Sequence, residues 1–363
     1  MNFDRDDLVA QALEQAHSLP APFYFTAESH ALDQRAVFAQ GWQLVAHACA
    51  LENTGDHVVA EVAGVPLVVV RGEDGQLRAL HNVCRHRAGP LATCDGRAAK
   101  RLRCKYHGWS YALDGQLVSA TEMDATAGFD VSSVRLPQAR VARWQGLVFA
   151  CLDARTPPLE EVIAGIDARV GDRGLAHYRF HQRVAYDIAC NWKVYIDNYL
   201  EGYHVPHIHP ELNALLDYRS YIVETAPWHS LQYSPLESGD ALYGNGEALY
   251  YLIWPNTLLN ILPDRLQTNR VLPLDAQRCR VVFDYCYPPD IASDEVAERH
   301  RRDHEFSDLV QRQDVDMCEI VQRNLASGSY RTGRLNPRRE DAVHHFHELL
   351  RGAYREDGAP PRG

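Results

Sequence analysis

The sequence contains no long apolar run. No stretch approaches the roughly eighteen consecutive apolar residues that a membrane-spanning helix requires. Residues 1–7 are acidic and lack the apolar segment of a secretory signal. We therefore expect a soluble, cytoplasmic protein with no membrane partner.

An excess of positive charge is absent as well. The formal net charge is −11 at pH 7, whereas a protein that binds nucleic acid gathers Lys and Arg over a wide face to neutralise phosphates. We therefore expect no nucleic-acid partner.

Paired cysteine spacing is nearly absent. The nine cysteines are an odd number spread over the whole chain, and apart from Cys84 and Cys104 they show no spacing typical of a disulfide framework. A chain of 363 residues can bury the cores of two domains without such staples. We expect the other cysteines to be reduced thiols.

Cys84 and Cys104 each stand close to a histidine. Cys84-Arg85-His86 is a Cys-x-His arm, and after 17 residues a Cys-x-x-His arm places His107 beyond Cys104. Each arm offers one thiolate and one imidazole, which suits a binuclear iron–sulfur cluster with two cysteines on one iron and two histidines on the other. A structural zinc site is the alternative, but zinc fingers usually place both cysteines on one arm and both histidines on the other. The pattern predicts a Rieske [2Fe-2S] cluster bound by Cys84, His86, Cys104 and His107.

The segment around these arms is basic. Between His81 and His107, seven basic residues face the single acid Asp95, a local charge of +6. Either this patch guides an acidic electron donor to the cluster by electrostatic steering, or its members offset the cluster's own charge and pair with nearby acids. The seven residues are Arg85, Arg87, Arg97, Lys100, Arg101, Arg103 and Lys105.

The pattern of apolar residues changes twice along the chain. Residues 4–17 and 27–40 have helix-like spacing, which predicts an N-terminal helical arm over residues 1–41. From Trp42 onward short β-rich runs predict an all-β domain over residues 42–155, with strands at 57–62, 65–70 and 147–150. Pro66 indicates that its strand begins there or lies at an edge.

Thr156-Pro157-Pro158 marks a boundary to a third region, residues 156–363, which mixes strands and helices. It contains a predicted strand over residues 281–287. A long charged helix is predicted over residues 293–325 with Ser293 as N-cap, followed by a second helix over residues 339–351.

Residues 197–209 concentrate three histidines and two acids. Two imidazoles and one carboxylate on one face of an iron leave positions open for oxygen and substrate. We select His204 and His209 as ligands, with His207 as the spare. The third ligand is expected from the long helix, where Asp314 and Asp316 face different sides so that only one can point at the metal.

These motifs, in this order, resemble the oxygenase α subunit of the Rieske non-haem iron oxygenases, and the resemblance covers most of the chain. Aligned on Glu319 and Gln322, it favours Asp314 as the third iron ligand. It places Glu201 where the family usually has the aspartate that links a neighbouring subunit's cluster to the iron, so glutamate here is a departure. A narrower similarity, over residues 254–260 and 318–330, is to the choline and carnitine monooxygenase group.

The resemblance implies an α+β fold, in which an all-β Rieske domain is joined to a helix-grip catalytic domain, an antiparallel sheet around a long helix. Electrons from NAD(P)H would pass through a separate reductase or ferredoxin to the cluster and then to mononuclear Fe(II), which activates O₂ at a bound small molecule. It also implies a homotrimer in which one subunit's cluster serves the next subunit's iron. A simple Rieske electron carrier needs little more than one small domain, so the long remainder of this chain argues against it.

The expected reaction is hydroxylation or oxidative N-demethylation of a small quaternary or tertiary amine. Besides the resemblance, aromatic residues near the iron stretch suit a methylated cation, which has no hydrogen bond to offer. They are Tyr195, Tyr199, Tyr203, Tyr250, Tyr251 and Trp254. At these spacings the same residues also suit an ordinary core. The competing substrate is an aromatic ring or aromatic acid, stacked on these rings and anchored by Arg265 or Arg270.

Overall fold

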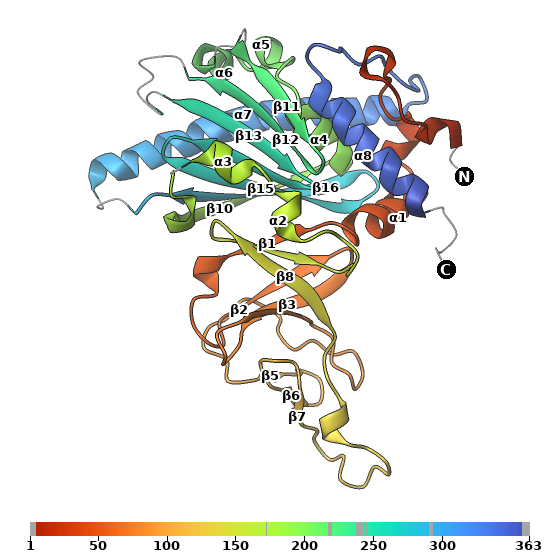
Figure 1. The fold of residues 1–363 in the computed structure, drawn as a ribbon, viewed down its shortest axis with the longest axis vertical. Coiled ribbons are helices and arrows are strands. Elements are labelled where there is room, and N and C mark those ends of the chain that lie inside the picture. The colour runs from red at the N-terminus through yellow and green to blue at the C-terminus, as the bar shows by residue number, and fades with distance from the viewer. Residues whose placement is uncertain are drawn as a thin grey trace. The chain divides into compact units, whose positions relative to one another are not determined.

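The computed structural model describes residues 5–171, 173–216, 220–236, 243, 246–289 and 293–357. The chain forms two compact units. Residues 38–159 make up one unit, and the N-terminal stretch up to residue 37 joins residues 160 onward in the other. Each unit is described by itself (Figure 1).

The unit of residues 38–159 is built on a six-stranded antiparallel sheet with strand order β1-β9-β8-β4-β3-β2. A second sheet has three short strands in the order β5-β6-β7. The predicted strands at 57–62, 65–70 and 147–150 are present as β2, β3 and β9. The bounds are β1 Gln43–His47, β2 His57–Val62, β3 Val65–Arg71, β4 Leu77–His81, β5 Leu102–Arg103, β6 Ser110–Tyr111, β7 Leu117–Ser119, β8 Gln138–Trp144 and β9 Leu147–Cys151.

Strand β3 shows why this unit has two cores. Successive side chains of a strand point to opposite faces, so Val68 and Val70 pack into one core and Leu67 and Val69 into the other. The strand therefore reads as one continuous apolar run. It begins at Val65, as Pro66 indicated, and lies between β2 and β4 rather than at an edge.

The other unit contains a seven-stranded antiparallel sheet with strand order β10-β16-β15-β14-β13-β12-β11. The predicted strand 281–287 is the second half of β16. The bounds are β10 Arg179–Ile188, β11 Ile222–Ala226, β12 His229–Pro235, β13 Glu247–Ile253, β14 Thr257–Leu262, β15 Arg265–Asp275 and β16 Arg278–Tyr287.

The long predicted helix is α7, which lies along this sheet (Figure 1). It spans Asp294–Ala326, and Ser293 Oγ accepts a hydrogen bond from the Val296 amide as its N-cap. On the sheet side, the hydroxyl of Tyr285 bonds Ser307 of α7. The predicted α+β class is confirmed. The other helices are α1 Ala27–Leu32, α2 Leu159–Val162, α3 Ile166–Val170, α4 Trp192–Tyr199, α5 Val205–Ile208, α6 Pro210–Leu215 and α8 Asp341–Asp357.

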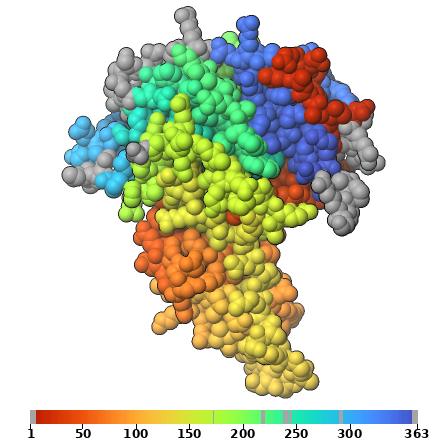
Figure 2. All heavy atoms as spheres, in the orientation of Figure 1, coloured from red at the N-terminus to blue at the C-terminus, as the bar shows by residue number. Residues whose placement is uncertain are grey.

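The N-terminal arm differs from the predicted pair of helices. Over residues 5–17 the chain forms two 3₁₀ turns, Arg5–Leu8 and Leu13–Gln15, instead of one helix, while α1 continues as a π-helix over Asp33–Phe38. The reason is tertiary: backbone groups of residues 16–21 bond to residues 331–335, for example the Ser18 amide to the Gly333 carbonyl at 2.8 Å. In the space-filling view the arm, in red, lies against the blue C-terminal helix (Figure 2).

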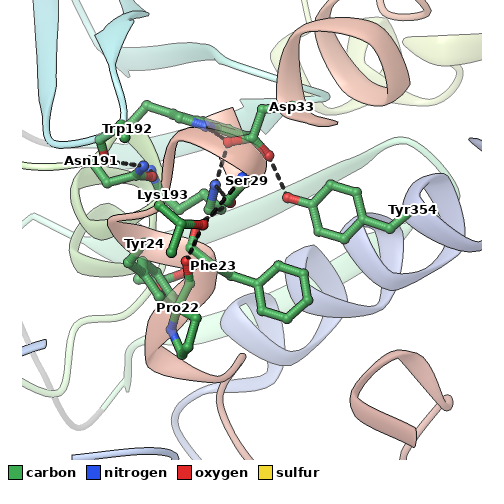
Figure 3. A network of polar contacts seen from close by, with 12 residues as sticks. Pro22, Phe23, Tyr24, Ser29, Asp33, Asn191, Trp192, Lys193 and Tyr354 are labelled. Carbon is green, nitrogen blue, oxygen red and sulfur yellow. Dashed lines mark hydrogen bonds and ion pairs between the residues drawn. The ribbon is translucent and has the colours of Figure 1, made fainter. Parts of the chain in front are cut away.

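A buried polar network fixes the start of α4 to this arm (Figure 3). Asp33 accepts hydrogen bonds from Trp192 Nε1 at 2.8 Å and from the Tyr354 hydroxyl at 2.5 Å, and it pairs with the Lys193 ammonium. Both charged side chains are fully buried. Burial lowers the pKa of Lys193, against the opposing effect of Asp33. Three segments of the chain thus meet at one carboxylate.

Two expectations for the whole chain can be compared with the structure. None of the nine cysteines forms a disulfide. Among the described residues, every helix is too short or too polar to cross a membrane.

Candidate metal centres and substrate cavity

Two similar loops carry the Cys-x-His and Cys-x-x-His arms. In the first, the Ala88 amide bonds the Cys84 carbonyl at 3.0 Å. In the second, the Gly108 amide bonds the Cys104 carbonyl at 3.1 Å. Ala88 (φ 55°) and Gly108 (φ 76°) both adopt the left-handed conformation that closes the turn. A bond of 3.0 Å from the Lys105 amide to the Pro90 carbonyl joins the loops.

The loops bring two thiols and two imidazoles together. Cys84 and Cys104 are each 3% exposed, and the pKa of the Cys84 thiol is raised by burial and by the adjacent Cys104. His86 and His107 lie further out, with ring centroids 4.7 Å apart. Sulfur donors inside and nitrogen donors outside match the two unlike irons of a Rieske cluster.

Beside the thiols, position 89 has no room for a side chain. A Cβ at Gly89 would lie 2.8 Å from Cys104 Sγ, so glycine is required there. The Tyr111 hydroxyl lies 3.3 Å from Cys84 Sγ and accepts a bond from the Arg85 amide. Trp109 stacks on His86 with centroids 4.8 Å apart. The residues present therefore fit a cluster at the predicted position.

The basic patch is on the surface. All seven of its side chains are exposed. Arg97 pairs with Asp56 at 3.0 Å, and Arg87 lies over the ring of Tyr106, 5.3 Å from its centroid. The Arg97–Asp56 pair agrees with the second interpretation for that residue. Guidance of an electron donor to the cluster stays a prediction.

The second predicted metal site is assembled from two parts of the chain. His204 precedes α5, His209 stands between α5 and α6, and Asp314 comes from the middle of α7. Asp314 Oδ1 lies 2.9 Å from His209 Nε2 and 3.7 Å from His204 Nε2. One donor atom from each residue falls within 4.8 Å of the other two, which fits a single metal ion.

The alternatives left open by the sequence lie elsewhere. Asp316 and His207 are exposed, whereas Asp314 faces the two imidazoles. Side chains two residues apart on a helix point about 200° apart. When Asp314 faces the imidazoles, Asp316 therefore faces solvent.

Each imidazole of the site is held from behind. Glu201 Oε1 lies 2.6 Å from His204 Nδ1, and its Oε2 accepts the His204 amide at 3.0 Å. Gln313 Oε1 lies 2.7 Å from His209 Nδ1. Partners at Nδ1 fix the ring orientation and leave Nε2 for a metal. Glu201 was singled out from the sequence, but Gln313 was missed. The only hint of Gln313 in the sequence is that it directly precedes the candidate ligand Asp314.

Asp314 has a further partner, since Asn198 Nδ2 donates to its Oδ1 at 2.7 Å. Burial lowers the pKa of His209, but hydrogen bonds to Asp314 and Gln313 outweigh this effect and the net pKa is raised. Without metal, the imidazole therefore tends to keep a proton. Metal binding has to displace that proton, so occupancy depends on pH.

A cavity of about 120 Å³ adjoins this site. One water needs roughly 10–15 Å³ on the same measure, so the space suits a small organic molecule. Besides the metal-site residues, seven aromatic rings line it. They are Tyr195, Tyr199, Tyr221, Tyr243, Tyr250, Phe283 and Phe306.

Only part of the aromatic set expected from the sequence lines this cavity. Tyr195, Tyr199 and Tyr250 do. Tyr203 is 46% exposed, and Trp254 packs on Phe346 with centroids 5.9 Å apart. A cage of Tyr199, Tyr203 and Trp254 is therefore not present.

The remaining expected aromatic, Tyr251, faces His229. Of the four rings that were missed, Phe283 comes from β16, Phe306 from α7, and Tyr221 and Tyr243 from segments outside the strands. No local spacing in the sequence revealed them. Of the two candidate arginines, Arg265 lines the cavity, whereas Arg270 lies 3.8 Å from Asp284 and outside it.

Comparison with known families agrees with both centres. Residues 41–135 match the Rieske [2Fe-2S] domain, and residues 175–356 match the catalytic domain of the ring-hydroxylating α subunits. The chain belongs to the Rieske oxygenase α subunits. It is therefore an oxidoreductase with a [2Fe-2S] cluster and a mononuclear iron, which works with a reductase or ferredoxin. The carrier and structural-zinc alternatives are excluded.

Several relatives of this Rieske oxygenase act on amines. Choline monooxygenase of Arabidopsis thaliana is 36% identical, over 93% of this chain and 83% of the relative. The carnitine monooxygenase oxygenase subunit of Escherichia coli K12 is 29% identical, over 94% and 95%. A solved quaternary ammonium Rieske monooxygenase in complex with L-carnitine superposes with a TM-score of 0.86 at 25% identity, covering 98% of this chain and 99% of that one.

Proposed function

We propose that this α subunit oxidises a small quaternary or tertiary amine at a carbon bonded to nitrogen. The observation that carries the proposal is the cavity beside His204, His209 and Asp314, whose walls include seven aromatic rings. Ring faces attract a methylated ammonium that offers no hydrogen bond. The amine substrates named for the relatives support the same class.

The roles of the residues follow from the geometry. Cys84, His86, Cys104 and His107 would hold the cluster, and His204, His209 and Asp314 the iron. Glu201 and Gln313 orient the two imidazoles. When bound, the Fe(II) site supplies O₂ activation, with positions left open by the three protein ligands.

The reaction balances as a monooxygenation. A C–H bond next to nitrogen, O₂, two electrons from NAD(P)H and two protons give C–OH and water. When the carbon is an N-methyl group of a quaternary ammonium, the product R₃N⁺–CH₂OH collapses to R₃N, formaldehyde and a proton. The aromatic walls exclude water from the reacting carbon and hold the ammonium without donating to it.

We further propose a cytoplasmic homotrimer in which Glu201 connects His204 of its own subunit to the cluster ligand His107 of the neighbour. Both oxygens of Glu201 already contact His204. A head-to-tail ring of this kind closes most simply with three copies. The exposed basic patch would steer an acidic reductase or ferredoxin to the cluster.

The test is turnover of the reconstituted protein with a reductase and a panel of methylated amines and aromatic acids. Formaldehyde release and substrate-coupled NAD(P)H consumption with at least one amine is the expected result. Coupled consumption with aromatic acids lacking methyl ethers, and with no amine, would overturn the amine assignment in favour of ring hydroxylation. The alternative of an aromatic-acid substrate is favoured by Arg265, which lines the cavity and could pair with the acid.

A further inference from the structure

Arg265 is a buried cation in the wall of the substrate cavity. It is the first residue of β15, is 6% exposed and lines the same cavity as the iron-site residues. Its Nη1 donates to Asp303 Oδ1 at 2.5 Å and lies 3.3 Å from the Tyr243 hydroxyl. The guanidinium therefore has a fixed position.

Asp303 is itself anchored. It accepts hydrogen bonds from the hydroxyls of Tyr243 at 2.5 Å and Tyr287 at 2.5 Å, besides the bond from Arg265. Asp303 is 3% exposed. Because the aspartate is held from three sides, it holds the guanidinium in turn. The pair is neutral overall, so it does not repel an ammonium elsewhere in the cavity.

Only one of the three guanidinium nitrogens is used. Nη1 makes the bonds to Asp303 and Tyr243, whereas Nη2 donates to no group within the part of the chain that the structure describes. Nε is buried and also lacks a partner there. Buried N–H donors are nearly always satisfied, and an arginine fork suits a carboxylate. Unused donors at a cavity wall point to an acceptor on the ligand.

Helix α7 separates the partner of this arginine from the iron site. Asp303, the partner of Arg265, and Asp314, the iron-site carboxylate, are 11 residues apart on α7. At 1.5 Å per residue this is roughly 16 Å along the helix axis. Phe306, Val310 and Gln311 line the cavity between them. The guanidinium and the metal site therefore lie toward opposite ends of one cavity.

Resting on the proposed function, we propose that Arg265 binds a carboxylate at the far end of the amine, so that the substrate is a zwitterionic N-methylated amino acid. The ammonium lies among the aromatic rings, its reacting carbon faces the site of His204, His209 and Asp314, and the carboxylate meets Arg265. An amino alcohol such as choline would offer the unused Arg265 donors no charged acceptor. Asp303 is a positioning residue, since it acts through Arg265.

The experiment compares trimethylammonium carboxylates with trimethylammonium alcohols of the same chain length. kcat/KM is measured with the reconstituted enzyme, and dissociation constants are measured by calorimetry on the enzyme without reductase. The wild-type protein is expected to favour the carboxylate of the best-fitting length by about 10- to 100-fold, the range of a hydrogen bond to a charged group. In Arg265→Gln this preference collapses through KM and the dissociation constant, with a smaller change in kcat.

Arg270→Gln is the matched control, because Arg270 is an arginine of the same strand that lies outside the cavity. It should keep the wild-type preference. If Arg265→Gln does not fold because Asp303 loses its partner, Arg265→Gln/Asp303→Asn removes both charges and is used instead. Preference for alcohols in the wild type, or an equal loss for both classes in the variant, would overturn the inference and leave the amine function standing. Turnover of aromatic acids with no amine would overturn the proposed function itself.

Discussion

The imidazoles of His204 and His209 show how single side chains prepare the iron site. Each ring has an oxygen partner at Nδ1 and presents Nε2 toward Asp314. Outer partners of this kind typically account for a 10- to 100-fold effect on metal affinity. The consequence is that iron occupancy depends on residues that never touch iron.

Removing the amide behind His209 tests this dependence. Gln313→Ala leaves His209 Nδ1 without its partner at 2.7 Å, and we expect about a 10- to 100-fold loss in iron affinity with the cluster retained. Iron titration of the apo-site, alongside EPR of the reduced cluster, measures both. Arg312→Ala is the control, because its guanidinium pairs with Asp308 on the exposed side of α7. An unchanged iron affinity in Gln313→Ala would contradict the role.

Asp314→Ala is expected to lose the mononuclear iron and all oxygenation while the cluster EPR signal stays intact. The reason is that its Oδ1 faces Nε2 of both imidazoles, at 3.7 Å from His204 and 2.9 Å from His209. Asp316→Ala, on the exposed side of the same helix, is the control and should keep its iron. The opposite pattern would show that the ligand assignment on α7 is wrong.

His345 of α8 is expected to make stability depend on pH. Burial, with smaller effects of His229 and His344, lowers its pKa to about 4. An unfolded histidine titrates near 6.5, so the folded state resists protonation. The free energy of unfolding is therefore highest above about pH 6.5 and falls as the pH drops toward 4. The expected loss from this residue is on the order of 1–3 kcal/mol.

Urea denaturation at several pH values measures this loss. His345→Gln should flatten the fall between pH 6.5 and 4, whereas His177→Gln, which replaces an exposed histidine, should not. A fall of the same size in His345→Gln would assign the acid sensitivity to other groups.

At the scale of elements, Asp33 ties the N-terminal arm and α8 to the start of α4. Asp33→Ala leaves the buried Lys193 ammonium without its counter-charge, and we expect a loss of about 3–5 kcal/mol in the free energy of unfolding. Asp33→Leu/Lys193→Met removes both charges and should be less destabilising. Chemical denaturation compares the two. A loss below about 1 kcal/mol for Asp33→Ala would show that the ion pair contributes little.

Elements with local signals could be predicted, and elements shaped by distant partners could not. α7 was predicted because Ser293 caps it and charged residues follow with helical spacing. The Cys-x-His loops were predicted because the ligands of each arm are close in sequence. The helix predicted over residues 5–17 was wrong, because the adjoining backbone of residues 16–21 forms hydrogen bonds with residues 331–335. Four of the cavity rings were missed for a similar reason, since the fold brings Phe283 of β16 and Phe306 of α7 to one cavity from separate elements.

At the scale of the whole molecule, Glu201 is the proposed connection between subunits. Glu201→Gln is expected to keep both metals and the trimer, yet to lose most of its turnover, because the amide cannot replace the carboxylate between His204 and the neighbour's His107. Metal analysis, light scattering and single-turnover oxidation of the cluster measure these three properties. Normal turnover in Glu201→Gln would remove the bridging role, and a fully active monomer would remove the assembly.

If Arg265 binds the substrate carboxylate as proposed, the 11-residue separation of Asp303 and Asp314 on α7 sets the length of the substrate. If the acid that holds the arginine stood one turn further along, at the position of Ser307, the guanidinium would lie about 6 Å nearer to the metal site. Such a protein would select correspondingly shorter molecules with the same catalytic residues. Oxygenases with this fold could then differ in substrate length through the position of one acid–arginine pair along the helix, with no change in the iron ligands.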